Sequence, residues 1–244
     1  MTRRLLIGLG LLFALTVLVR FPARWALALA PADWHCDQPA GSLWHGGCAR
    51  VQMGEFALGP VSWSLHPLSL LLARIDLDLH SMDERAQGHA RVQFRSRHFV
   101  RLLDIRAQVA LDAGLMPLFP NDWDGSLLLG LDTLDIAEGR LERVHGTINA
   151  TSLAQRSPSM PIGSYELRFD APPQADGTIS GALSDRGGPL AVSGTLQVRK
   201  GGQYELAGNV TTRPEASADL SKAVQFLGAA DAQGRRSFSL AGNL

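Results

Sequence analysis

Apolar and polar residues alternate along most of the chain from residue 49 onward. The alternation is cleanest at 75–80, where Ile75, Leu77 and Leu79 are separated by polar side chains. Successive side chains of a strand point to opposite faces, so a period of two predicts half-buried β-strands. Strands are expected at 49–58, 61–65, 75–80, 90–94, 105–111, 127–136, 139–150, 164–169, 177–183, 190–198, 203–210 and 237–244.

Turn sequences separate these strands, most evenly in the C-terminal third. Asp176-Gly177 and Gly187-Gly188-Pro189 are typical of hairpin turns, so the strands are expected to form an antiparallel meander. Residues 112–126 contain two prolines and are expected to form a loop. Residues 154–163 are expected to form a connection, which is the best candidate for a domain boundary.

One helix is expected in this β-rich part, at residues 215–227. Four of its apolar residues recur at helical spacing and form one stripe: Leu220, Ala223, Val224 and Leu227. Gly228 is a natural helix C-cap. The apolar element at 68–73 is too short to span a membrane. The expected fold is therefore mainly β: an antiparallel, hairpin-rich curved sheet, either a trough or a partial barrel, with one short C-terminal helix.

A charge-free apolar run, residues 5–19, follows Arg3 and Arg4 near the N-terminus. It is shorter than the roughly 20 residues that usually span a bilayer. Arg20 at its far end can extend the span by snorkelling, and Trp25 is typical of a membrane interface. We therefore expect a cytoplasmic N-terminus at residues 1–4 and a transmembrane anchor at 5–21, with the rest exported.

A cleaved signal peptide is the alternative to this anchor. Ala28-Leu29-Ala30 has the small-x-small pattern of a cleavage site. Arg20 and Arg24 separate that site from the apolar run, and Pro31 would follow the cut directly. These features favour an uncleaved anchor, and both alternatives export the rest of the chain.

The chain has only two cysteines, Cys36 and Cys48, both shortly after the anchor. An even cysteine count in an oxidising compartment predicts one disulfide. His35 and His45 lie beside the cysteines, so a zinc site and free thiols are the alternatives. Zinc sites usually show paired C-x₂₋₄-C spacing, which this pair lacks.

The composition adds little that would assign chemistry. The chain carries 23 basic and 23 acidic residues, which offers no basic surface for nucleic acid. Basic residues concentrate in the middle, where a solvated face is the simplest interpretation: Arg91, Arg95, Arg97, His98, Arg101 and Arg106. Asp76, Asp78 and His80 share one strand face and are also expected to be solvated. No hydrolase, P-loop or metalloprotease motif is present, so we expect no enzyme, catalytic residue, metal or cofactor.

Several short motifs follow the anchor in a recognisable order. They are Gly41-x-Leu43-Trp44-x-Gly46-x-x-Ala49, Leu58-Gly59-x-Val61-x-Trp63-x-Leu65-x-Pro67-x-x-Leu70, Leu102-Leu103-Asp104-Ile105, Gly163-x-Tyr165-x-Leu167, Asp185-x-Gly187-Gly188-Pro189-Leu190 and Gly234-Arg235. As an ordered set covering nearly the whole chain, they resemble the type II secretion system protein N family.

This resemblance implies a single-pass subunit of the bacterial inner membrane with a periplasmic β domain at 41–244, joined to the anchor by a connector at 22–40. Such a subunit would be an accessory part of the machine that exports folded proteins across the outer membrane. Its implied partners are the inner-membrane platform proteins and the outer-membrane secretin. Trp44 and Trp63 are candidates for either interaction or packing.

A weaker similarity to AsmA-type periplasmic proteins, in the hairpin-rich pattern of the chain, leaves an alternative function open. In that case the chain would be a membrane-anchored module whose curved sheet binds lipid on its apolar side.

Overall fold

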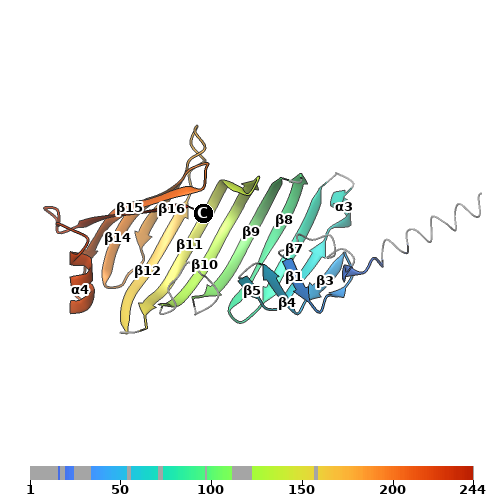
Figure 1. Ribbon diagram of the computed structural model, residues 1–244, viewed down its shortest axis with the longest axis horizontal. Coiled ribbons are helices and arrows are strands. Elements are labelled where there is room, and N and C mark those ends of the chain that lie inside the picture. Colours follow the sequence, from blue (N-terminus) through green and yellow to red (C-terminus); the bar gives the residue numbers. More distant parts are fainter. Residues whose placement is uncertain are drawn as a thin grey trace, which may run out of the picture.

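One large antiparallel sheet forms most of the protein in the computed structural model, which describes residues 16, 20–24, 34–53, 56–70, 74–96, 98–111, 123–156 and 159–243 (Figure 1). Its thirteen strands lie in the order β16-β15-β14-β13-β12-β11-β10-β9-β8-β7-β6-β3-β2. From β6 to β16 each strand therefore pairs with the next strand along the chain. The order does not close on itself, so the sheet is an open trough rather than a barrel.

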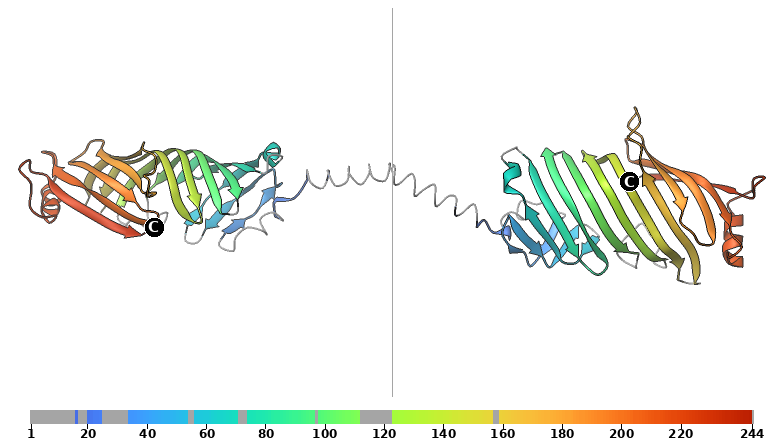
Figure 2. Two further views of the ribbon diagram at one scale, coloured as in Figure 1. Left: turned by 90° about the horizontal axis from the view of Figure 1, so that it is seen from above. Right: turned by 180° about the vertical axis from the view of Figure 1, so that it is seen from behind.

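The strands of this sheet are β2 (Ala40–Gly41), β3 (His45–Cys48), β6 (Val61–Leu65), β7 (Ile75–Met82), β8 (Ala86–Ser96), β9 (Phe99–Ala110), β10 (Trp123–Ala137), β11 (Arg140–Gln155), β12 (Met160–Phe169), β13 (Ile179–Asp185), β14 (Leu190–Val198), β15 (Gln203–Thr212) and β16 (Arg236–Asn243). Figure 2 shows that the sheet is twisted and curled along its length.

The strand register gathers the apolar side chains of the sheet on one side. Ala107, Leu129 and Ile148 are opposite one another on β9, β10 and β11, so their side chains share a face. We call this side the apolar face and define it by Leu79, Val92, Ile105, Ala107, Leu129, Ile148, Leu167, Leu183, Leu196, Leu206 and Phe238. The opposite side, the polar face, carries charged residues such as Asp78, Arg91 and Glu166, whereas Asp185 and Arg236 lie at the ends of strands on the apolar face.

A second, three-stranded sheet covers the N-terminal end of the apolar face. Its strands are β1 (Trp34–Asp37), β4 (Arg50–Met53) and β5 (Phe56–Leu58), in the order β1-β4-β5. It lies in front of the large sheet in Figure 1 and behind it in the right-hand view of Figure 2. Leu58 of β5 packs against a buried cluster that includes Val109 and Leu127 of the large sheet. The fold therefore has two β layers at this end.

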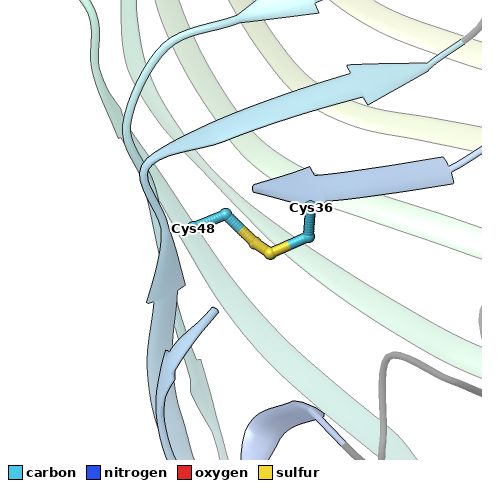
Figure 3. The surroundings of a disulfide bond; sticks show 2 residues. All are labelled: Cys36 and Cys48. Carbon is cyan, nitrogen blue, oxygen red and sulfur yellow. A yellow bond between two sulfur atoms is a disulfide. The ribbon is translucent and has the colours of Figure 1, made fainter. Parts of the chain in front are cut away.

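The disulfide between Cys36 and Cys48 joins these two layers (Figure 3). Cys36 lies on β1 of the small sheet, and Cys48 ends β3 of the large sheet. Their Cα atoms are 5.5 Å apart. The amide of Ala49 also donates to the carbonyl of Asp37 at 3.0 Å. Of the three states considered for this pair, the structure contains the disulfide.

Helix α4 (Ala218–Gln225) covers the other end of the apolar face. Leu220 and Val224 pack against Leu190 and Val210 of the sheet. The helix begins later than the predicted residue 215 because the Ser217 hydroxyl accepts a hydrogen bond from the Leu220 amide and caps the N-terminus, and it ends at the C-cap Phe226. A second, very short helix, α3 (Pro67–Leu70), follows β6 and overlaps the first half of the apolar element noted at 68–73.

Three sequence-based boundaries differ from the structure. The connection expected at 154–163 is no domain boundary, because β11 and β12 form one hairpin in which Gln155 is opposite Met160. Strand β10 starts inside the loop expected at 112–126, since Trp123 pairs with Gln155. Strand β1 falls within the predicted connector 22–40, so folded β structure begins before residue 41.

The predicted anchor falls almost entirely outside the described residues, as do Arg3, Arg4 and Trp25. Among the residues that the structure describes, no helix is both long and apolar enough to cross a membrane.

Ion pairs tie neighbouring strands together on the polar face. The buried Asp135 carboxylate accepts two hydrogen bonds from Arg101, at 2.6 Å from Nε and 2.8 Å from Nη2. Glu166 is also buried, and it accepts from Arg168 at 2.7 Å and Arg186 at 2.5 Å. The hydrogen bond from Arg186 lowers the pKa of Glu166 below its ordinary value of 4.5, and Arg168 lowers it further, which outweighs the effect of burial.

We expect the Glu166→Gln variant to lose stability in a pH-dependent way. A lowered folded-state pKa stabilises the protein above the unfolded-state pKa, and this contribution disappears as the pH falls through the folded-state value. The variant should therefore lose on the order of 1 kcal/mol at pH 7, and the difference should shrink below pH 4.5. Urea unfolding of both proteins at pH 7 and pH 3 measures this difference. Glu205→Gln, at an exposed pair, is the matched control and should change little.

We expect the double variant Cys36→Ser, Cys48→Ser to be less stable by about 2–3 kcal/mol, because the disulfide closes a short loop of the unfolded chain. Hydrogen exchange should accelerate first in β1, β4 and β5, since β1 loses its disulfide link to β3 of the large sheet. Reduced wild-type protein should behave as the variant does. Unchanged exchange in these three strands would contradict the assigned role of the disulfide.

Candidate functional site

The middle of the apolar face forms one hydrophobic cluster of the sheet. Phe169, Ile179 and Val198 are buried there by the curl of the sheet and by their neighbours. Ile105, Leu167 and Leu196 pack against this cluster and are only partly buried. The small sheet and α4 cover the two ends. A face of this kind can bind apolar groups, because covering it removes hydrocarbon from water.

The charged residues of the polar face are largely paired rather than free. Asp78 accepts a hydrogen bond from Arg91 at 2.8 Å and lies 2.6 Å from the His66 ring nitrogen. Partial burial raises the pKa of Asp78, but the partners Arg91 and His66 outweigh it, and the net pKa is lowered. Arg91 is 52% exposed, as expected for a solvated face, whereas Arg101 is only 22% exposed because it pairs with the buried Asp135. Among the described residues, no cluster of His, Cys, Asp and Glu could hold a metal ion.

The two candidate tryptophans lie where β3 meets β6. The Trp63 indole donates to the carbonyl of Leu43 at 3.1 Å and lies against Gly46. A Cβ atom on Gly46 would come within 2.5 Å of the indole, so this position requires glycine. Trp44 is half-buried, and its carbonyl accepts from the Leu65 amide at 2.7 Å. Both residues thus contribute to packing and hydrogen bonding within this corner.

The chain that follows the predicted anchor is attached to the same corner. The amide of Leu43 donates to the carbonyl of Phe21 at 2.8 Å, and Pro22 forms a bridge with Ser42. Ala23 is buried, whereas Arg20 and Arg24 are exposed. Of the predicted anchor flanks, Arg20 is the one that the structure describes.

The two edges of the large sheet differ in how they are protected. Strand β2 has only two residues, and the Phe21–Pro22 segment pairs beside its end. Gly41 of β2 has a φ of +84°, which favours glycine and turns the chain. Short edges of this kind resist pairing with another chain.

The opposite edge, β16, has eight residues and is unprotected. After Arg236 its sequence carries no charge and no proline, and Leu240 is 58% exposed. In the described chain, β16 pairs only with β15. The alternation at 237–244 predicted a strand, but a single sequence does not show which strand lies at a free edge.

The chain is similar to known proteins over nearly its whole length. Residues 32–239 match the family described as type II secretion system (T2SS), protein N. The type II secretion system protein N of Aeromonas hydrophila is 27% identical over 228 residues, covering 90% of this chain and 89% of that protein. The type II secretion system protein N of Pectobacterium carotovorum subsp. carotovorum is 23% identical over 245 residues, covering 98% and 96%.

No solved structure matches this chain. The family match spans both sheets as far as the first half of the open edge strand β16, and it includes helix α4. The chain belongs to the type II secretion system protein N family.

Proposed function

We propose that this protein is a non-enzymatic accessory subunit of the type II secretion system, held in the inner membrane by residues 5–21. In this proposal its β domain lies in the periplasm and contacts other secretion components while folded proteins cross the outer membrane. The family supports the role in secretion. The charge-free run after Arg3 and Arg4 supports the anchor, and the disulfide suits an oxidising compartment.

The observation that carries the proposed contact is the open edge at β16. Thirteen strands at a spacing of about 4.8 Å place β16 roughly 60 Å along the sheet from β2. The anchor segment attaches beside β2, so the open edge is the part of the sheet farthest from it along the strand order. An extended segment of a platform protein or of the secretin can add to β16 by main-chain hydrogen bonds, with its apolar residues beside Phe238 and Leu240.

A charged residue on β16 should impair secretion without unfolding the domain. Leu240→Lys places a charge on the open edge, which disfavours strand addition. We expect exoproteins to accumulate in the periplasm of cells carrying this variant, while periplasmic enzymes stay at normal levels. Leu128→Lys is the matched control, because Leu128 is also exposed but lies on the polar face of a central strand.

A photo-cross-linking residue at Ser239 identifies the contact directly. Cross-links to platform proteins or to the secretin in living cells are the expected result. A secretion defect that appears equally in both lysine variants, with no cross-link at Ser239, would count against the edge as the contact.

Lipid binding on the apolar face is a second candidate function, favoured by the partly exposed residues of that face such as Ile105 and Leu167. Acyl chains lying along this face would remove it from water. Mass spectrometry of gently purified protein tests this alternative. Co-purified lipid, lost from a variant with Leu167→Glu, would support it, and protein free of lipid at any stoichiometry would reject it.

A further inference from the structure

A group of exposed apolar side chains lies at the corner formed by α3 and the adjoining ends of β7 and β8. Leu68 is 75% exposed and Ile75 is 44% exposed, and Leu70 and Phe94 are also exposed. Ile75 and Phe94 are directly opposite one another on β7 and β8. We call these four residues the α3 corner. Neither the proposed strand contact at β16 nor the apolar middle of the sheet uses them.

The backbone of the α3 corner is fixed by hydrogen bonds centred on the buried Ser69. Its hydroxyl donates to the carbonyl of His66 at 2.6 Å and accepts from the amide of Asp76 at 3.3 Å. Its carbonyl accepts from the amide of Arg74 at 3.1 Å. With Ser69 held inward, Leu68 and Leu70 on either side of it are held outward. Their exposure is thus built into the fold.

The α3 corner lies at the end of the molecule where the anchor segment joins the sheet. Phe21 is hydrogen bonded to Leu43, which lies two residues before β3. Trp44 is hydrogen bonded to Leu65, which is two residues before α3. In Figure 1, α3 and the blue segment of residues 20–24 lie at the same end of the molecule. A membrane that holds the anchor is therefore close to this corner.

The charge around the α3 corner matches an anionic lipid surface. Arg74 is exposed at this corner, and the nearby Asp76 and Asp78 lie on the polar face, where Asp78 is paired with Arg91 and His66. Arg95 is exposed directly after Phe94, and Arg20 and Arg24 are exposed on the anchor segment. Apolar side chains surrounded by basic ones are typical of surfaces that insert shallowly at the boundary between headgroups and acyl chains.

We propose that the α3 corner is a second membrane contact, which holds the β domain against the bilayer that contains the anchor. This inference rests on the proposed anchor. Leu68, Leu70, Ile75 and Phe94 enter the headgroup region, and Arg74 and Arg95 bind anionic headgroups. Two contacts fix the orientation of the sheet, whereas an anchor alone leaves the domain free to swing.

The test uses the full chain in vesicles of phosphatidylethanolamine and phosphatidylglycerol. An environment-sensitive fluorescent amino acid replaces Leu68, and lipids brominated on their acyl chains act as quenchers. We expect the label at position 68 to shift to shorter wavelength and to lose most of its emission. The same label at Met82, which is 77% exposed on the polar face, is the matched control and should remain unquenched.

Two further measurements separate the apolar and electrostatic parts of the contact. Leu70→Glu with Ile75→Glu should abolish quenching at position 68. Arg74→Glu with Arg95→Glu, or vesicles of phosphatidylcholine alone, should reduce it, and salt at about 1 M should have the same effect because it screens charges beyond roughly 3 Å.

Flotation of the vesicles distinguishes failure of this inference from failure of the proposed function. If the protein floats with the vesicles but the label at position 68 is not quenched, the proposed membrane contact of the α3 corner is wrong and the proposed anchor still holds. Protein that does not float would overturn the anchor and, with it, the inference. A cross-link from position 68 to another protein in cells, without quenching in vesicles, would assign the corner to a protein partner and also overturn the lipid contact.

Discussion

The structure depends on one hydrogen-bonded ladder that runs without interruption from β6 to β16. Because side chains alternate along a strand, a shift of one residue between two strands would move every apolar residue to the wrong side. The apolar residues stay on one side of the ladder even where the register between two strands changes. One such change lies between β8 and β9 at Asp104, which has a φ of +48°. Ile105 and Leu102 flank this irregularity and still share the apolar face, because the extra residue restores the alternation.

A single-layered sheet leaves its apolar face in contact with water unless something covers it. Three devices reduce that exposure here: the curl of the sheet, helix α4 and the small sheet. The disulfide between Cys36 and Cys48 links the small sheet to the large one, so this bond contributes to coverage of the apolar face. Charge pairs such as Asp135 with Arg101 stabilise the other face by joining neighbouring strands.

Sequence periodicity predicted the parts of this fold that are set locally. Residues 190–198 coincide with β14, and the stripe through Leu220 and Val224 marks the helix side that packs on the sheet. Periodicity could not predict pairing between distant residues, so the partner of Asp135 and the exposed position of β16 came from the structure. The sequence predicted a connection at 154–163 but not its kind, because a polar turn with proline looks alike in a hairpin and between domains, and only the ladder across Gln155 and Met160 tells them apart.

The nearest-neighbour order of the strands also determines how the chain can fold. Each strand from β7 onward finds its partner in the segment made just before it, so no long loop has to close first. The sheet can therefore grow from its N-terminal end one hairpin at a time. In that order β16 is the last strand of the described sheet to pair, so its free edge forms only after the rest of the ladder is in place.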